Sequence, residues 1–100
     1  MTESAKDPIQ HSEGGGHGEF FIVREGNRIA ELTYSSAGES AVVVGHTWVD
    51  PKHRGGTLAP SLVDAVVAWA REGNRKIVPA CSYVRRVFSS SHKFDDVWSK

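Results

Sequence analysis

The pattern of apolar and polar positions predicts a sheet in the first half of the chain. Residues 20–23 form a β-branched and aromatic run, and residues 29–34 alternate so that every second residue from Ala30 to Tyr34 shares one face. A Glu-Gly-Asn-Arg turn joins the two runs, because glycine and asparagine accept positive φ. We therefore predict an antiparallel hairpin.

A third strand is predicted over residues 41–49, after a turn at residues 35–40. The start of this strand is apolar on both faces, which is typical of a central, buried strand. Pro51 ends it, since proline has no N–H to donate to a neighbouring strand.

The following segment has the period of a helix. An apolar stripe begins at Leu58 and recurs at helical spacing as far as Trp69, and a second stripe lies beside it, so this helix is predicted to be largely buried against the sheet. Pro60 falls in the first turn, where N–H groups have no helical partner, and Gly73 is a natural C-terminal stop.

A fourth, short strand is predicted at residues 76–81, and Ser82 is placed to cap a second helix. Because strand–helix–strand crossovers are right-handed, the third and fourth strands should run parallel. The predicted class is thus α/β (α+β): three antiparallel strands, a helix, a parallel strand and a helix. Residues 92–98 are predicted as a last helical turn or a short strand.

Composition narrows the possible classes of function. The chain has 100 residues, enough for one domain, and a net charge of +0, which argues against a nucleic-acid coat or a polybasic membrane anchor. No apolar run approaches the ~20 residues of a membrane span. Cys81 is the only cysteine, so no internal disulfide can form, which fits a reducing, cytoplasmic location.

Residues 1–18 are polar and rich in glycine, and we predict a disordered tail there, with the folded domain over residues 19–100. His11 and His17 lie in this tail without a further ligand at metal spacing. They are therefore predicted to be solvated histidines, and no metal site is expected.

The loop at residues 52–57, KHRGGT, carries the main candidate chemistry. Glycines let the backbone approach a ligand closely, first-turn N–H groups of a helix lack acceptors, and Arg54 adds charged, forked donors. The loop therefore suggests a phosphate site, with an ordinary tight strand-to-helix connection as the alternative. It matches neither the Walker loop nor the dinucleotide fingerprint.

Two motifs resemble the GNAT superfamily of acetyl-CoA-dependent N-acetyltransferases. Residues 54–59 resemble its Gln/Arg-x-x-Gly-x-Gly/Ala loop, with Thr57 in place of the central glycine. Residues 46–55 (HTWVDPKHRG) and 79–84 (PACSYV) resemble a class of small, single-domain members, as does the later SHKFDD segment. The resemblance covers residues 19–98.

This resemblance implies a minimal acyl-CoA N-acyltransferase fold in which coenzyme A lies between two splayed parallel strands. The pantetheine arm would pair with the edge of the third strand like an added strand, and the pyrophosphate would rest on the loop. The implied contacts to acetyl-CoA or coenzyme A are Trp48, Val49, Arg54, Gly55, Gly56, Thr57, Leu58 and Ala59.

The resemblance also implies transfer of an acetyl group to an amine, for which three residues are candidates. His46 is the candidate base, or else a buried histidine bonded within the sheet. Tyr83 is the candidate acid for the leaving thiolate, or a packed helix residue. Cys81 is a candidate acyl-accepting nucleophile, or a small residue packed beside the cofactor sulfur. His92 either contacts the adenine and ribose, orients the last segment, or lies on the surface.

Full-sized members of the superfamily carry a helical insertion between their first two strands, which the turn at residues 25–28 replaces here. We therefore expect an open acceptor side that favours a protein or peptide amine, in a monomer or weak homodimer. A non-catalytic sensor or interaction module that binds coenzyme A or acyl-CoA is the alternative function, and a plain α/β interaction domain without a cofactor is a third.

Overall fold

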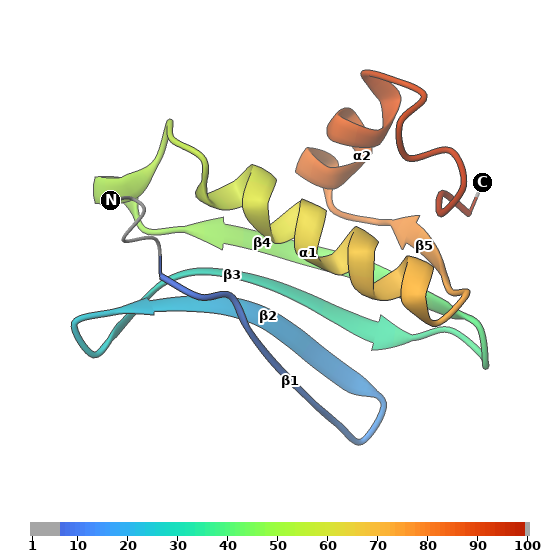
Figure 1. Cartoon of the computed structure of the whole chain (residues 1–100), viewed down its shortest axis with the longest axis horizontal. Coiled ribbons are helices and arrows are strands. Elements are labelled where there is room, and N and C mark those ends of the chain that lie inside the picture. The colour runs from blue at the N-terminus through green and yellow to red at the C-terminus, as the bar shows by residue number, and fades with distance from the viewer. Residues whose placement is uncertain (1–6, 100) are drawn as a thin grey trace.

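The computed structural model describes residues 7–99 and shows one five-stranded sheet with two helices on the same side (Figure 1). Strands β1 to β4 form an antiparallel meander, and β5 pairs with β4 in parallel, so the strand order follows the sequence. The predicted α/β (α+β) class and element order are confirmed, with one added strand. The elements are β1 (Gln10–Gly14), β2 (His17–Arg24), β3 (Asn27–Ser36), β4 (Ala41–Val49), the short 3-10 helix η1 (Pro51–His53), α1 (Leu58–Glu72), β5 (Lys76–Pro79) and α2 (Ser82–Ser89).

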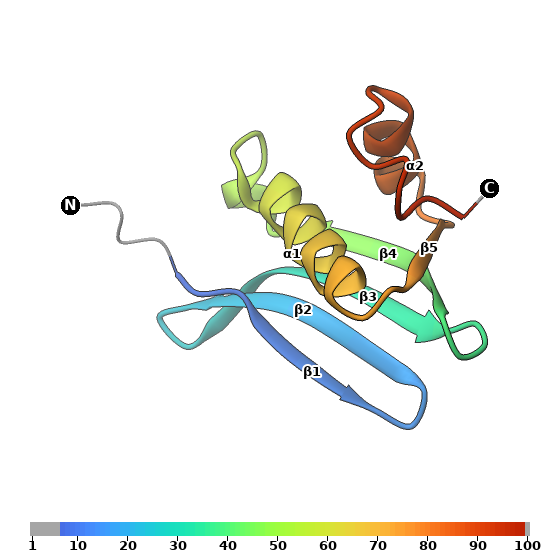
Figure 2. The same ribbon diagram turned by 45° about the vertical axis from the view of Figure 1, so that its right-hand side comes forward.

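Helix α1 lies along one face of the sheet, as Figure 2 shows, and the core lies between them. It ends as predicted at Gly73, whose N–H donates to the carbonyls of Trp69 and Arg71. The alternation in the strands buries every second side chain beneath the helices. No described helix is long and apolar enough to cross a membrane. The fully buried side chains include Ile22, Leu32, Val44, Leu62, Val63, Val66, Val67, Ile77, Val84 and Phe88.

The opposite face of the sheet, which we call the helix-free face, carries the alternate side chains of the strands. None of these side chains is buried in the described part of the chain, since no element covers them. These side chains are polar, charged and aromatic, as expected for the face of an antiparallel sheet that is exposed to water. The helix-free face comprises Ser12, Glu19, Phe21, Glu31, Thr33, Ser35, Val43, His46 and Trp48.

The prediction of a disordered tail is wrong for residues 10–18. β1 pairs along its whole length with β2, and Gly15 and Gly16 make the tight turn between them with φ of 63° and 84°. His11 is not a solvated histidine, because it stacks on Phe20 with 4.1 Å between ring centroids. The sequence did not predict β1 because the strand is polar in composition and contributes few side chains to the core. Residues 1–6 lie outside the described residues.

The segment at residues 92–98 forms turns followed by a single bridge between Trp98 and Ile77. The N–H of Ile77 donates to the carbonyl of Val97 (2.6 Å), and the N–H of Ser99 donates to the carbonyl of Ile77 (2.8 Å). The end of the chain therefore covers the outer edge of β5.

Candidate functional site

The two parallel strands separate halfway along β4. They pair only from Ala41 to Val44, and the carbonyl of Val44 accepts the last two hydrogen bonds, from the N–H groups of Ala80 and Cys81 (3.0 Å each). At the next residue, Gly45, the pairing of β4 with β3 shifts by one position, which is a β-bulge. Bulges bend and twist the strand that carries them, so β4 turns away from β5 here. The expected splay is confirmed.

Beyond the bulge, β4 has a free edge on the side of β5. The N–H of Asp50 donates to the carbonyl of Ile29 in β3 (2.8 Å). Because successive residues of a strand direct their backbone groups to opposite edges, the N–H and C=O groups of Thr47 and Val49 point away from β3. Of these groups, the N–H of Thr47 bonds to Sγ of Cys81 and the carbonyl of Val49 accepts from Nε of Arg54 (2.8 Å). The carbonyl of Thr47 and the N–H of Val49 are available for an extended ligand.

A cavity of about 270 Å³ opens at this free edge, between the N-terminal ends of α1 and α2. Every residue predicted to bind the cofactor lines it except Thr57, and Tyr83 closes it from α2. The set of cofactor contacts implied by the sequence did not include Thr47 and His53. The lining residues are Thr47, Trp48, Val49, His53, Arg54, Gly55, Gly56, Leu58, Ala59 and Tyr83.

The loop before α1 has the conformation of a ligand-binding turn. Gly55 has a φ of 85°, in the region that favours glycine, whereas Gly56 has no positive φ. Thr57 precedes the first helical residue with a φ of −105°, so its branched side chain is accommodated at the position where the superfamily motif has glycine. No acidic residue lies in the first turn of α1, so the positive end of the helix dipole is not neutralised there.

Arg54 is held at the mouth of the cavity by its bond to Val49. This bond uses Nε, and within the described residues no hydrogen bond occupies the two terminal nitrogens. The exposed guanidinium can therefore donate two parallel hydrogen bonds to a phosphate while its stem stays anchored.

Cys81 lies at the point where the strands part and precedes the first residue of α2. Its Sγ is 3.5 Å from Oγ1 of Thr47, across the splay. Burial raises the pKa of the Cys81 thiol. Hydrogen bonds from the hydroxyl of Thr47 and from the N–H groups of Val84, Tyr83 and Thr47 outweigh that effect, and the pKa is lowered overall. The site therefore stabilises the thiolate relative to that of a free cysteine, as helix N-termini do.

Tyr83 is half-buried on the first turn of α2 and faces the cavity. Burial raises the pKa of its hydroxyl, and the nearby charge of Arg86 only partly opposes this. The hydroxyl consequently stays protonated at neutral pH and can donate a proton or a hydrogen bond.

His46 lies on the helix-free face, on the other side of β4 from Cys81 and Tyr83. Its side chain is 52% exposed, and Nε2 is 3.3 Å from Oε2 of Glu31, whose other oxygen accepts from Arg28 (3.1 Å). The alternative of a buried histidine bonded within the sheet is therefore wrong: the bulge at Gly45 turns this side chain toward water.

His92 is on the surface, with its side chain 97% exposed, and bonds to Asp95 (2.9 Å). It does not line the cavity, so the surface alternative is the correct one. Glu31 and Gly45 are site residues that the sequence reasoning missed. An isolated glycine inside a strand pattern was the available signal for the bulge.

The chain was compared with known proteins. The family model described as GCN5-related N-acetyl-transferase matches residues 19–97. A GCN5-like protein of Staphylococcus aureus, solved in solution by NMR, is 30% identical, with 90% of this chain and 87% of that protein covered and a TM-score of 0.71. No curated protein sequence matches at a comparable level.

Two more distant structures share the fold alone. A ribosomal-protein-alanine N-acetyltransferase from Brucella melitensis biovar Abortus 2308 is 22% identical over 75% of this chain, with a TM-score of 0.60, and this chain spans 59% of that enzyme's length. An aminoglycoside N-acetyltransferase in complex with CoA is 17% identical over 77% of this chain and 67% of that one, with a TM-score of 0.56.

Proposed function

The chain belongs to the GCN5-related N-acetyltransferase family, and from that premise we propose that it transfers an acetyl group from acetyl-CoA to an amine of a protein or peptide. The observation that carries the proposal is the cavity at the splay, where phosphate donors, a free strand edge and a phenol meet. One of its lining residues, Thr47, has its hydroxyl 3.5 Å from the thiol of Cys81. The short turn between β2 and β3 leaves the acceptor side open, which suits a large acceptor.

The residues around the cavity fit coenzyme A. Arg54 and the N–H groups at the start of α1 would hold the diphosphate, because both favour anions. The free C=O group of Thr47 and the free N–H group of Val49 would pair with the amides of the pantetheine arm as a neighbouring strand would. Acetyl-CoA supplies the thioester carbonyl, which would then lie near Cys81.

Tyr83 is the proposed general acid. In a direct transfer, a base removes a proton from the ammonium group of the acceptor, and the amine nitrogen bonds to the thioester carbonyl carbon. The carbon–sulfur bond then breaks, the phenol of Tyr83 protonates the leaving thiolate, and its phenolate regains a proton from the nitrogen of the new amide. His46 is the proposed base. It would accept the proton of the acceptor's ammonium group from the helix-free side of β4, where Glu31 orients the imidazole.

Cys81 offers a two-step route. Its thiolate would bond to the thioester carbonyl carbon and expel the coenzyme A thiolate, and the amine would then displace Cys81 from the acyl group. In this route, Cys81→Ala abolishes transfer and the wild type forms an acetylated enzyme detectable by mass spectrometry. If Cys81→Ala keeps full transfer, only direct attack remains.

Binding is tested by thermal unfolding with coenzyme A. At a hundred times its Kd, the ligand should raise the free energy of unfolding by about 2.7 kcal/mol, or about 10–20 °C in Tm for a domain of this size. Arg54→Glu should abolish the rise. Lys52→Glu, the same charge change in the same loop but outside the cavity, should keep it. Equal behaviour of the two variants would contradict the loop assignment.

The non-catalytic sensor is the second candidate function, and the exposure of His46 on the face opposite Cys81 is the observation that favours it. Both functions require coenzyme A binding, but only the enzyme releases free thiol from acetyl-CoA when an amine is present. A coenzyme-dependent rise in Tm without amine-dependent thiol release would support the sensor.

A further inference from the structure

The outer edge of β1 is a bare edge of the sheet. The sheet has two outer strands, β1 and β5, and the end of the chain covers β5 at Ile77. Within residues 7–99, no strand pairs with the far side of β1, which is the outermost strand in Figure 2. Lysine, proline or a bulge commonly protects such an edge, and β1 contains none of these. All five of its residues are exposed.

The turn between β1 and β2 determines which backbone groups face this edge. Gly14 and His17 flank a two-residue turn, and residues in that position exchange backbone hydrogen bonds with each other. Because backbone groups alternate between the two edges of a strand, those of Ser12 also point to β2. The N–H and C=O groups of His11 and Glu13 therefore point outward, and no strand of the described chain pairs with them.

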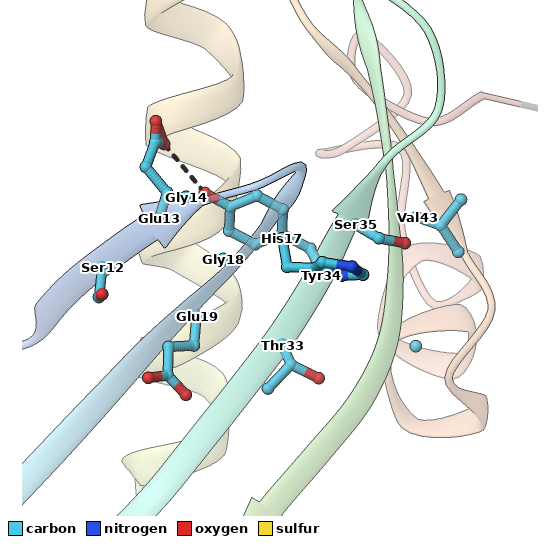
Figure 3. A pocket seen from close by; sticks show the side chains of 11 residues that line it. Ser12, Glu13, Gly14, His17, Gly18, Glu19, Thr33, Tyr34, Ser35 and Val43 are labelled. Atoms are coloured by element: carbon cyan, nitrogen blue, oxygen red, sulfur yellow. Dashed lines mark hydrogen bonds between the residues drawn. The ribbon is translucent and has the colours of Figure 1, made fainter.

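The side chains of His11 and Glu13 are held on the face of β1 that α1 covers. The imidazole of His11 lies edge-on to the ring of Trp69 (5.2 Å between centroids), and its Nε2 is 2.6 Å from the hydroxyl of Tyr34. That hydroxyl donates to Oε1 of Glu13 (3.2 Å), the bond drawn as a dashed line in Figure 3. These contacts use one ring nitrogen and one carboxylate oxygen. Nδ1 of His11 and Oε2 of Glu13 have no hydrogen-bond partner among residues 7–99.

We propose that the edge of β1 binds the same edge of a second copy of this chain, with the two strands antiparallel and Ser12 opposite Ser12. In this register, His11 of each copy lies opposite Glu13 of the other, and the outward N–H and C=O groups of each such pair exchange backbone hydrogen bonds. A histidine directly opposite a carboxylate favours strand pairing. The contact has two-fold symmetry and closes on itself, so the product is a dimer in which the two five-stranded sheets are continuous.

Backbone direction and side-chain charge select the same register. Sliding one strand by a single residue would place the outward groups opposite groups that already bond to β2. Sliding it by two residues keeps the backbone bonds, but then Glu13 lies opposite Glu13, where like charges repel, or His11 lies opposite His11, where no carboxylate faces the ring. This self-complementarity favours a second copy as the occupant of the edge. The dimer does not depend on acetyl transfer, because β2 and β3 separate β1 from the coenzyme cavity at β4.

Disulfide cross-linking in a glutathione redox buffer tests the register. Ser12→Cys, Gln10→Cys and Gly14→Cys are each made in a Cys81→Ala background, which removes the natural thiol. Directly opposed residues of a non-hydrogen-bonded antiparallel pair have Cα atoms ~4.5 Å apart, within the range of a disulfide, so Ser12→Cys should form a covalent dimer. Gln10 would oppose Gly14 of the second copy and lie about 14 Å from its own equivalent. Neither of these two variants should therefore cross-link alone, whereas their mixture should.

Sedimentation velocity measures the association itself. The wild type should shift from monomer to dimer as its concentration rises from about 10 µM to about 1 mM. Glu13→Pro removes the carboxylate and the outward N–H, whereas the matched control Glu13→Ala removes the carboxylate and keeps the N–H. The dissociation constant of Glu13→Pro should be about tenfold or more above that of Glu13→Ala, because each copy loses one backbone bond. The bonds from β1 to β2 are untouched in both variants, and circular dichroism checks that both fold.

Three outcomes would overturn the proposal. The first is a wild type that stays monomeric up to about 1 mM, which would leave the edge to a strand of another protein. The second is an equal dissociation constant for Glu13→Pro and Glu13→Ala. The third is a covalent dimer from Gln10→Cys or Gly14→Cys alone, or none from Ser12→Cys. The coenzyme-dependent rise in Tm should be the same in the two Glu13 variants, so a failure of the dimer is distinguishable from a failure of the proposed function.

Discussion

Replacing each of the two loop glycines with alanine separates backbone strain from side-chain crowding. Gly55 and Gly56 are adjacent, and a new Cβ at either position meets no atom closer than 4.0 Å. Only Gly55 has a left-handed φ, of 85°. A residue with a Cβ is strained in that region, at a cost of about 1–2 kcal/mol. Gly55→Ala should therefore be destabilising, and Gly56→Ala should not.

The magnitude follows from the difference between the two variants. Both lose the same conformational freedom in the unfolded chain, because each exchanges one glycine for alanine, so that contribution cancels. The difference in the free energy of unfolding is then the strain alone, about 1–2 kcal/mol. For a domain of this size each kcal/mol corresponds to about 4–8 °C, so the Tm of Gly55→Ala should lie roughly 4–16 °C below that of Gly56→Ala.

The assay is thermal and urea unfolding of both variants, followed by circular dichroism without coenzyme. Urea unfolding checks that the slope of free energy against denaturant is unchanged, so that the same surface is exposed in both. Equal stabilities, or a less stable Gly56→Ala, would refute the loop conformation on which the phosphate site depends.

Three further predictions concern the sheet and the thiol. The rate of alkylation of Cys81 by iodoacetamide should rise with pH, and the midpoint of that rise should lie below the ordinary thiol pKa of 9.0, because the pKa of Cys81 is lowered. Thr47→Val should raise the midpoint, and an unchanged midpoint would show that the Thr47 hydroxyl does not lower the pKa. Gly18→Ala should destabilise by about 1–3 kcal/mol in urea unfolding, since its Cβ would lie 2.2 Å from the ring of Tyr34, whereas Gly14→Ala has open space and should be neutral. Burial raises the pKa of the Tyr34 hydroxyl to about 12, so the unfolded chain loses the phenolic proton at a lower pH than the folded chain does. The contribution of Tyr34 to the free energy of unfolding should be full below pH 10 and fall as the pH rises toward 12, and Tyr34→Phe should flatten that decline.

Local pattern was enough for the elements that bury a regular stripe. The alternation in residues 29–34 and the helical stripe from Leu58 to Trp69 predicted β3 and α1, because a side chain's direction repeats with a fixed period within one element. The loop motif predicted which residues gather around the coenzyme cavity, since they lie within a short stretch of chain whose ends are set by β4 and α1.

Contacts between distant parts of the chain decided the rest. The polar segment β1 forms a strand only because of two contacts with β2. Its backbone pairs with the edge of β2, and His11 stacks on the ring of Phe20. Cys81 and Thr47 are 34 residues apart, and only the splay brings the thiol to that hydroxyl.

The sequence by itself determined the order of the strands and helices, the family and the loop before α1, because these depend on residues close together in the chain. The tertiary structure alone decided that the bulge at Gly45 turns His46 away from Cys81 and onto the helix-free face, beside Glu31. The physical reason is that a one-residue shift in strand pairing reverses the face of every side chain after it, and that shift depends on how β3 and β4 fit together.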